Sequence, residues 1–215
     1  MHRVSANESL RERKKHQARL ELVRSAVVLF REQGFEATTV EQIAAHANFS
    51  SRTFFRCFGS KEDVVFADIP LLAAEFRKGL DEEHPGEDPW VVVRDALAEQ
   101  TVKFATMAPE LEVQCVQLWF AEPVLRRRYA QILGEWEEIA AEYLHNAWGS
   151  SLGIEAKVAG CSLIGVARTV VEEGASSERE IRELLGRGFR LLDACFSAEG
   201  QRRAGRGSTS RAAMP

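Results

Sequence analysis

Two arginines four residues apart, Arg52 and Arg56, stand among hydroxyl and aromatic residues in the segment NFSSRTFFRCFGSKE, residues 48–62. Side chains four apart share one face of a helix, where two like charges repel each other mildly unless an anion lies between them. An arginine can donate two parallel hydrogen bonds to guanine in the major groove, or it can hold a phosphate. The segment therefore has the chemistry of a nucleic-acid contact.

Periodicity sorts this segment into two faces. Phe54 and Phe58 lie four apart on an inner stripe, whereas the two arginines lie on the outer face. Nearby hydroxyls and a lysine are groups that commonly contact phosphates. A helix that is only solvated and amphipathic is the alternative interpretation. The residues that we predict to contact DNA are Thr38, Thr39, Ser50, Ser51, Arg52, Thr53, Phe55, Arg56 and Lys61.

Three short helices are predicted to position these residues. Apolar residues recur at helical spacing from about 13 to 33, and Gly34 suits the left-handed position that ends a helix. Thr38 or Thr39 can cap a second helix, and Glu41 lies three residues after Thr38, as a capping box requires. The link HANF leaves room only for a tight turn, in which Asn48 takes the left-handed position. This arrangement predicts a helix-turn-helix.

The rest of the chain also has helical periodicity, and no strand alternation competes with it. Gly and Pro separate helices expected at about 61–79, 89–107, 109–121, 123–148, 154–173 and 178–197. We therefore predict an all-α fold of about nine helices. Its predicted parts are an unstructured arm at 1–12, a helix-turn-helix domain at 13–60, a ligand-binding and dimerisation domain at 61–197, and an unstructured tail at 198–215.

Charge is distributed unevenly along the 215 residues, whose net charge is −4. Residues 1–61 carry 11 Lys and Arg against 6 Asp and Glu, whereas residues 62–197 carry 13 against 25. A basic head on an acidic chain suggests that the head alone meets a polyanion. No apolar run is long enough to span a bilayer, no signal peptide is visible, and the four cysteines are scattered. These features favour a cytoplasmic protein with free thiols that makes no membrane contact.

The stretch GFEATTVEQIAAHANFSSRTFFRCFGSKEDVV resembles the N-terminal domain of the TetR family of transcriptional regulators. The glycine, the threonine pair, Ile43-Ala44, Phe58, Lys61 and Glu62 match the family pattern in register, over about residues 15–65. The resemblance implies an all-α homodimer that binds a double-stranded DNA operator and responds to a small effector. Part of the stretch looks like a subgroup common in actinobacterial regulators.

Two positions depart from the family pattern. Asn48 stands where glycine is usual, and Phe55 stands where a tyrosine usually contacts a phosphate through its hydroxyl. Phe55 cannot donate that hydrogen bond, so it either contacts a thymine methyl or simply packs. The basic run RERKKHQAR is either a frayed helix start or an arm that reaches toward the DNA backbone or minor groove.

The remaining helices are expected to supply an effector pocket and a dimer interface. Aromatic stripes are more often core than pocket, but the resemblance implies a cavity for an apolar or amphipathic effector. One of Arg126, Arg127 and Arg128 could meet an anionic head group, so an acyl chain or acyl-coenzyme A is a possible effector. The predicted pocket residues are Phe76, Phe104, Met107, Trp119, Phe120, Tyr129, Trp136 and Tyr143, and the predicted interface residues are Gly160, Ile164, Leu185, Phe189 and Leu192.

Two other functions were weighed against a DNA-binding regulator. GCSLIG resembles a nucleophile elbow, but its spacing is one residue too long and it lies inside a predicted helix. The histidines are isolated, and no phosphate loop or dinucleotide fingerprint is present, so we expect no enzyme, no cofactor and no metal. A helical scaffold that has lost DNA binding remains open, with Phe55 as its only support.

Overall fold

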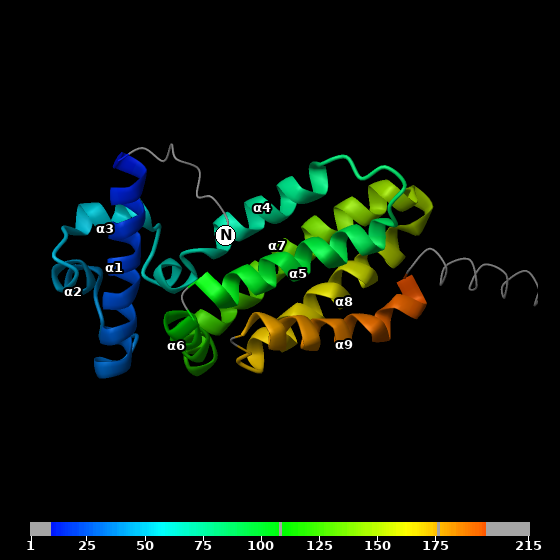
Figure 1. Cartoon of the computed structure of the whole chain (residues 1–215). Helices are drawn as coiled ribbons and strands as arrows, with labels where there is room; N and C mark the ends of the chain where they lie inside the picture. Colours follow the sequence, from blue (N-terminus) through cyan, green and yellow to red (C-terminus); the bar gives the residue numbers. More distant parts are fainter. Residues whose placement is uncertain (1–9, 108, 176, 197–215) are drawn as a thin grey trace, which may run out of the picture. The chain divides into compact units, whose positions relative to one another are not determined.

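The computed structural model describes residues 10–107, 109–175 and 177–196, and every regular element in these ranges is helical (Figure 1). The predicted all-α class is confirmed. The elements are α1 (Leu10–Gln33), α2 (Val40–His46), α3 (Ser51–Cys57), the 3-10 turn η1 (Glu62–Phe66), α4 (Ile69–Asp81), α5 (Pro89–Met107), α6 (Pro109–Ala121), α7 (Pro123–Trp148), the 3-10 turn η2 (Ser150–Leu152), α8 (Gly153–Glu172) and α9 (Glu178–Phe196).

Most helix boundaries follow the glycines and prolines of the sequence. Helices α5, α6 and α7 each begin at a proline. Proline suits a first helical turn, because a backbone N–H at that position would have no acceptor within the helix. Residue Gly34 has a φ of +88°, so the predicted left-handed end of α1 is present. The basic run RERKKHQAR lies within α1, which begins at Leu10. Residues 1–9 of the predicted arm and the whole predicted tail, 198–215, lie outside the described residues.

The helix expected at 61–79 is divided, which corrects the prediction. Residues Glu62–Phe66 form the 3-10 turn η1, and α4 begins only at Ile69. Pro70 explains the break, because a proline has no N–H to continue a helix and is tolerated only in the first turn. The connection between α3 and α4 is therefore a turn followed by a new helix.

The described residues divide into two compact units. The head unit comprises the chain up to Pro70 together with residues 117–128, and the body unit comprises residues 71–116 and those from Tyr129 onward. The boundaries between the units fall inside α4, α6 and α7. Three helices therefore run without interruption from one unit into the other.

In the head unit, α1 packs against α2, α3 and η1. The buried side chains of α1 recur at helical spacing on one face, and one large residue from each neighbour is fully enclosed with them. The core of the head is built from Leu22, Ala26, Val27, Phe30, Ile43, Ala44, Phe54, Phe58 and Val64.

In the body unit, α5, α8 and α9 pack against one another, and α8 and α9 run side by side in opposite directions (Figure 1). Helix α7 approaches α8 closely at Gly160, where an added Cβ would lie 3.0 Å from the backbone nitrogen of Ala141. The rings of Phe76 and Trp136 stack with centroids 5.1 Å apart. Among the helices described, none is both long and apolar enough to cross a bilayer.

Candidate nucleic-acid interface

The turn between α2 and α3 has the predicted helix-turn-helix geometry. Asn48 has a φ of +58°, and it is the only residue other than glycine with a positive φ in the described ranges. Asparagine tolerates this left-handed conformation better than other side-chain-bearing residues. The backbone nitrogen of Phe49 then donates to the carbonyl of Ala44 at 2.8 Å, which closes the turn. The predicted left-handed position of Asn48 is confirmed.

Inside the head, α3 is held by its aromatic face. The Phe54 and Phe58 side chains are 0% and 5% exposed, and their ring centroids lie 5.4 Å apart. The guanidinium of Arg19 lies 4.8 Å from the centroid of Phe58 and donates to the carbonyls of Cys57, at 3.0 Å, and Ala67. This one side chain from α1 therefore fastens both the end of α3 and the residue that follows η1.

The opposite face of α3 is open to solvent. Arg52 and Arg56 are exposed, and neither forms an ion pair or hydrogen bond with another described residue. The ring of Phe55 is 56% exposed and meets Phe54 edge-on, with centroids 5.6 Å apart. Free guanidinium groups can contact phosphates and guanine edges, and an exposed apolar ring can contact a thymine methyl group. The outer face of α3 thus brings together three of the predicted residues.

Some hydroxyl residues of this region cap the helices, and their exposure to solvent differs. The side chain of Ser50 caps α3 by accepting from the backbone nitrogen of Thr53 at 3.2 Å, and the two hydroxyls are 3.1 Å apart. Ser51 is half-buried at the start of α3. Thr39 is exposed and caps α2, with Gln42 completing the capping box. The capping box is therefore present but one residue later than predicted, with Gln42 in place of Glu41.

Thr38 is not available to DNA through its side chain. It is 1% exposed, its hydroxyl donates to the carbonyl of Gly34 at 2.7 Å, and it accepts from the Gln33 amide at 3.1 Å. A buried hydroxyl needs such internal partners, because leaving it unpaired costs stability. The structure therefore corrects the prediction that both threonines of the pair contact DNA.

Lys61 also has internal partners that the sequence did not reveal. Its ammonium donates to the carbonyls of Phe35 at 2.7 Å and Thr38 at 3.0 Å, and it lies 4.2 Å from the centroid of the Phe35 ring. This cation satisfies two backbone carbonyls in the loop between α1 and α2. The geometry thus gives Lys61 a structural role within the head, where a phosphate contact was predicted.

Sequence reasoning missed Arg19 and the place of Trp119. Arg19 lies three residues before Leu22, on the buried face of α1, so its position on an apolar stripe was a usable signal. Trp119 was predicted in the effector pocket, but it belongs to the head unit and stacks on Phe66 at 4.7 Å. Its indole nitrogen donates to the Val65 carbonyl at 3.0 Å. No local pattern in the sequence connects residues so far apart along the chain.

The other predicted pocket residues are placed differently from one another. Met107 is 38% exposed, and Phe120 and Tyr143 are half-buried. Burial raises the pKa of Tyr129 well above its usual range, and the nearby Glu172 carboxylate raises it further. The other predicted pocket residues in the body unit are buried: Phe76, Phe104, Tyr129 and Trp136. Arg128, a candidate for an anionic head group, donates to Asp63 at 3.3 Å.

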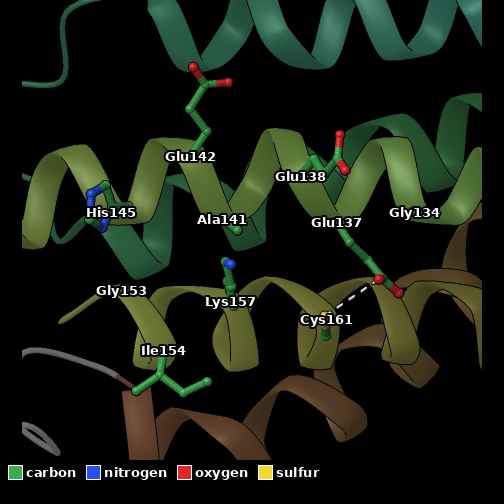
Figure 2. A pocket seen from close by; sticks show the side chains of 10 residues that line it. All are labelled: Gly134, Glu137, Glu138, Ala141, Glu142, His145, Gly153, Ile154, Lys157 and Cys161. Atoms are coloured by element: carbon green, nitrogen blue, oxygen red, sulfur yellow. Dashed lines mark hydrogen bonds between the residues drawn. The ribbon is translucent and has the colours of Figure 1, made fainter. Parts of the chain in front are cut away.

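A hollow of about 840 Å³ lies between α7 and α8 in the body unit (Figure 2). None of the predicted pocket residues lines it. Its walls carry small residues and several carboxylates, and Figure 2 shows Cys161 hydrogen-bonded to Glu137 across it. The lining residues are Gly134, Glu137, Glu138, Ala141, Glu142, His145, Gly153, Ile154, Lys157 and Cys161.

Four of the five predicted interface residues are buried within the single chain. Ile164, Leu185 and Phe189 are 1–5% exposed, and Gly160 is buried against α7. Side chains enclosed in this way have no surface left for a second chain, so this residue assignment is corrected. Leu192 is half-buried, and the apolar surface that α8 and α9 do expose includes Val158 and Leu191.

The fold and the head define a helical protein with a helix-turn-helix and a separate helical body. The family model described as "Bacterial regulatory proteins, tetR family" matches residues 22–67, and the model described as "MftR C-terminal domain" matches residues 87–197, more than half of the chain. The chain belongs to the TetR family of bacterial transcriptional regulators.

Relatives in sequence agree with this placement, and one solved structure shares the fold. The chain is 45% identical to the regulator TcmR of Streptomyces glaucescens over 80 residues, which are 37% of this chain and 35% of TcmR. It is 24% identical to the regulator MftR of Mycobacterium tuberculosis over 174 residues, which are 79% of this chain and 86% of MftR. GusR of Salmonella enterica superposes with a TM-score of 0.55 at 17% identity, over 84% of this chain and 95% of GusR, a likeness of fold alone.

Proposed function

We propose that this protein is a homodimeric, sequence-specific DNA-binding repressor that a small apolar or amphipathic effector releases from a palindromic operator in the bacterial cytoplasm. The observation that carries the proposal is the open face of α3, where the side chains of Arg52 and Arg56 have no partner among the described residues and the ring of Phe55 is also exposed. The other face of the same helix is fully packed, so the arginines are presented on a rigid support.

We assign the direct DNA contacts to the exposed or half-buried residues of this surface. Arg52 and Arg56 are the candidates for guanine or phosphate contact, and Phe55 is the candidate for a thymine methyl. Ser51, Thr53 and Thr39 are candidates for phosphate contact, because their hydroxyls lie at or near the same surface. Because Phe55 lacks a hydroxyl, it favours an operator with thymine at the position that it faces.

A two-fold dimer would present two copies of α3 to one face of the DNA, so the operator should be palindromic. We place the dimer surface on the exposed sides of α8 and α9, where Val158 is 48% and Leu191 is 79% exposed. Exposed apolar side chains on adjacent helices favour burial against a second copy. Val158→Asp together with Leu191→Asp should then shift the molar mass in sedimentation from dimer to monomer.

Effector binding would reach the head through the helices that the two units share. The boundaries between the units fall inside α4, α6 and α7, and the shared segment 117–128 packs on η1 through Trp119 and Arg128. A ligand that changes the course of these helices in the body would change the placement of the head. The free energy of ligand binding is then coupled to loss of DNA affinity. An acyl chain or acyl-coenzyme A remains the effector class to test first.

Selection of bound DNA from a random library, followed by affinity measurement, tests the proposal. The full chain should enrich a palindrome, and Arg52→Ala or Arg56→Ala should weaken binding to it by about 1–3 kcal/mol. Arg179→Ala, an exposed arginine in the first turn of α9, is the matched control and should bind as the unaltered chain does. A library from which no sequence is enriched would favour the scaffold alternative.

A further inference from the structure

The groove between α7 and α8 combines an apolar floor with an acidic wall. Gly134, Ala141 and Gly153 contribute no bulk to it, and Ile154 is 68% exposed at its end (Figure 2). Glu137, Glu138 and Glu142 line it from α7, against a single lysine, Lys157. An open groove of this composition suits a chain segment that carries arginines among small residues.

The acidic side chains are only partly neutralised by the rest of the chain. Glu142 forms an exposed ion pair with Arg77 at 3.3 Å, and Glu137 accepts from the Cys161 thiol at 3.4 Å. Glu138 is exposed and forms no ion pair with another described residue. Carboxylates that lie along one groove wall favour arginine, because its planar guanidinium can pair with a carboxylate through two hydrogen bonds.

The sequence beyond α9 has the complementary composition. Residues 197–215 carry four arginines and one glutamate, and Arg202, Arg203 and Arg206 are separated only by alanine and glycine. Because α8 and α9 run antiparallel, α9 ends at Phe196 near the start of α8, which is also the Gly153 end of the groove (Figure 1). At about 3.3 Å per residue, the six residues from Phe196 to Arg202 span up to about 20 Å. The groove wall from Gly134 to His145 is about 17 Å long at 1.5 Å per helical residue.

We propose that the C-terminal segment of the same chain, residues 197–215, binds in the α7–α8 groove, with Arg202, Arg203 and Arg206 near the carboxylates of Glu137 and Glu138. The positive charge of the segment is then held at the body and does not add to the basic surface of the head. This proposal does not depend on the identity of the effector or the operator.

Cys161 reports directly on whether the groove is covered, because its exposed thiol lines the groove. Alkylation of the full chain by neutral iodoacetamide is followed at the Cys161 peptide by mass spectrometry, with Cys57 of the head as internal reference. The triple variant Arg202→Ser, Arg203→Ser and Arg206→Ser should react about threefold to tenfold faster at Cys161, the factor that two or three surface ion pairs provide. Removal of nearby positive charge would by itself slow the reaction by disfavouring the thiolate, so only uncovering explains an increase.

A second measurement identifies the occupant. Carbodiimide couples amines to carboxylates in contact, so the new amine of Arg203→Lys should link to Glu137 or Glu138. The ion pair of Lys103 with Glu75 is an internal positive control for coupling. In a mixture of labelled and unlabelled chains, the link should join residues of one chain.

The remaining outcomes overturn the proposal. Equal Cys161 reactivity in the triple variant and the unaltered chain would show that the segment does not cover the groove. Protection of Cys161 that depends on protein concentration but not on the three arginines would assign the groove to a second copy. A coupling product only between labelled and unlabelled chains would assign it to the partner's segment.

Discussion

The indole nitrogen of Trp119 donates a buried hydrogen bond of 3.0 Å to the carbonyl of Val65. The same ring stacks on Phe66, with centroids 4.7 Å apart and an interplanar angle of 16°. Trp119 lies in the last turns of α6, whereas Val65 and Phe66 belong to η1, which follows α3 in the chain. Trp119 of α6 is therefore fixed to η1, the turn that connects α3 to α4.

Replacement of this tryptophan by phenylalanine should destabilise the protein. Trp119→Phe keeps an aromatic ring but leaves the buried Val65 carbonyl without its donor, so we expect a loss of about 1–3 kcal/mol in the free energy of unfolding. Urea denaturation followed by helical circular dichroism measures this loss at a fixed protein concentration. Trp148→Phe, at a half-exposed tryptophan, is the control and should change the free energy of unfolding by less than about 0.5 kcal/mol.

A substitution at Lys61 tests whether this residue has a structural role or contacts a phosphate. Lys61→Met keeps much of the apolar stem but removes the ammonium that binds the carbonyls of Phe35 and Thr38. We expect a loss of stability of about 1–3 kcal/mol, because two carbonyls lose a charged donor. Operator affinity should fall, while its dependence on salt concentration stays unchanged. If Lys61 instead contacts a phosphate, the slope of log affinity against log salt should fall by about 1.

Truncation of the neighbouring phenylalanines of α3 should affect different properties, stability for Phe54 and operator binding for Phe55. Phe54 is fully buried, so Phe54→Ala should cost about 3–5 kcal/mol of stability. Phe55 is 56% exposed, so Phe55→Ala should change stability by less than about 1 kcal/mol but weaken operator binding. Urea denaturation and a gel-shift titration of both variants separate the two effects. Unchanged operator affinity in Phe55→Ala would assign that ring to packing alone.

Local patterns in the sequence were sufficient for the helices and for the turn of the DNA-contact surface. Proline starts and glycine ends are signals within a few residues, and the left-handed position of Asn48 follows from turn geometry. The inner and outer faces of α3 were predicted from spacing, and Phe54 and Phe55 lie where that spacing put them.

Contacts between distant segments could not be predicted in the same way. The carbonyls that Lys61 binds, the packing of Trp119 on η1 and the burial of Ile164 depend on how helices meet in space. Gly160 was predicted at a dimer interface, and a close helix contact does lie there. The sequence could not show that the partner at Gly160 is α7 of the same chain.

Gly160 provides a direct test of that close approach. A Cβ at this position would lie 3.0 Å from the Ala141 nitrogen and 3.1 Å from the Glu137 carbonyl oxygen, and neither backbone atom can move freely. Gly160→Ala should therefore destabilise the protein by about 1–3 kcal/mol. Gly79→Ala in α4 is the matched control, because no atom lies within 4 Å of its added Cβ. The control should stabilise the protein by about 0.5–1 kcal/mol, since alanine favours a helix, and a stabilised Gly160→Ala would contradict the close α7–α8 contact.

The Cys161 thiol should titrate at a pH above that of an ordinary cysteine. Partial burial raises its pKa first, and the Glu137 carboxylate raises it further, because it accepts a hydrogen bond from the thiol and repels the thiolate. Glu137→Gln removes the negative charge, so the midpoint of the pH profile of Cys161 alkylation should move to lower pH. Glu135→Gln, an exposed neighbour on α7 that does not line the groove, should leave the midpoint unchanged. Comparison of midpoints at high salt separates this effect from any change in coverage of the groove, since exposed ion pairs are screened there. Equal midpoints in Glu137→Gln and the unaltered chain would show that the carboxylate does not act on the thiol.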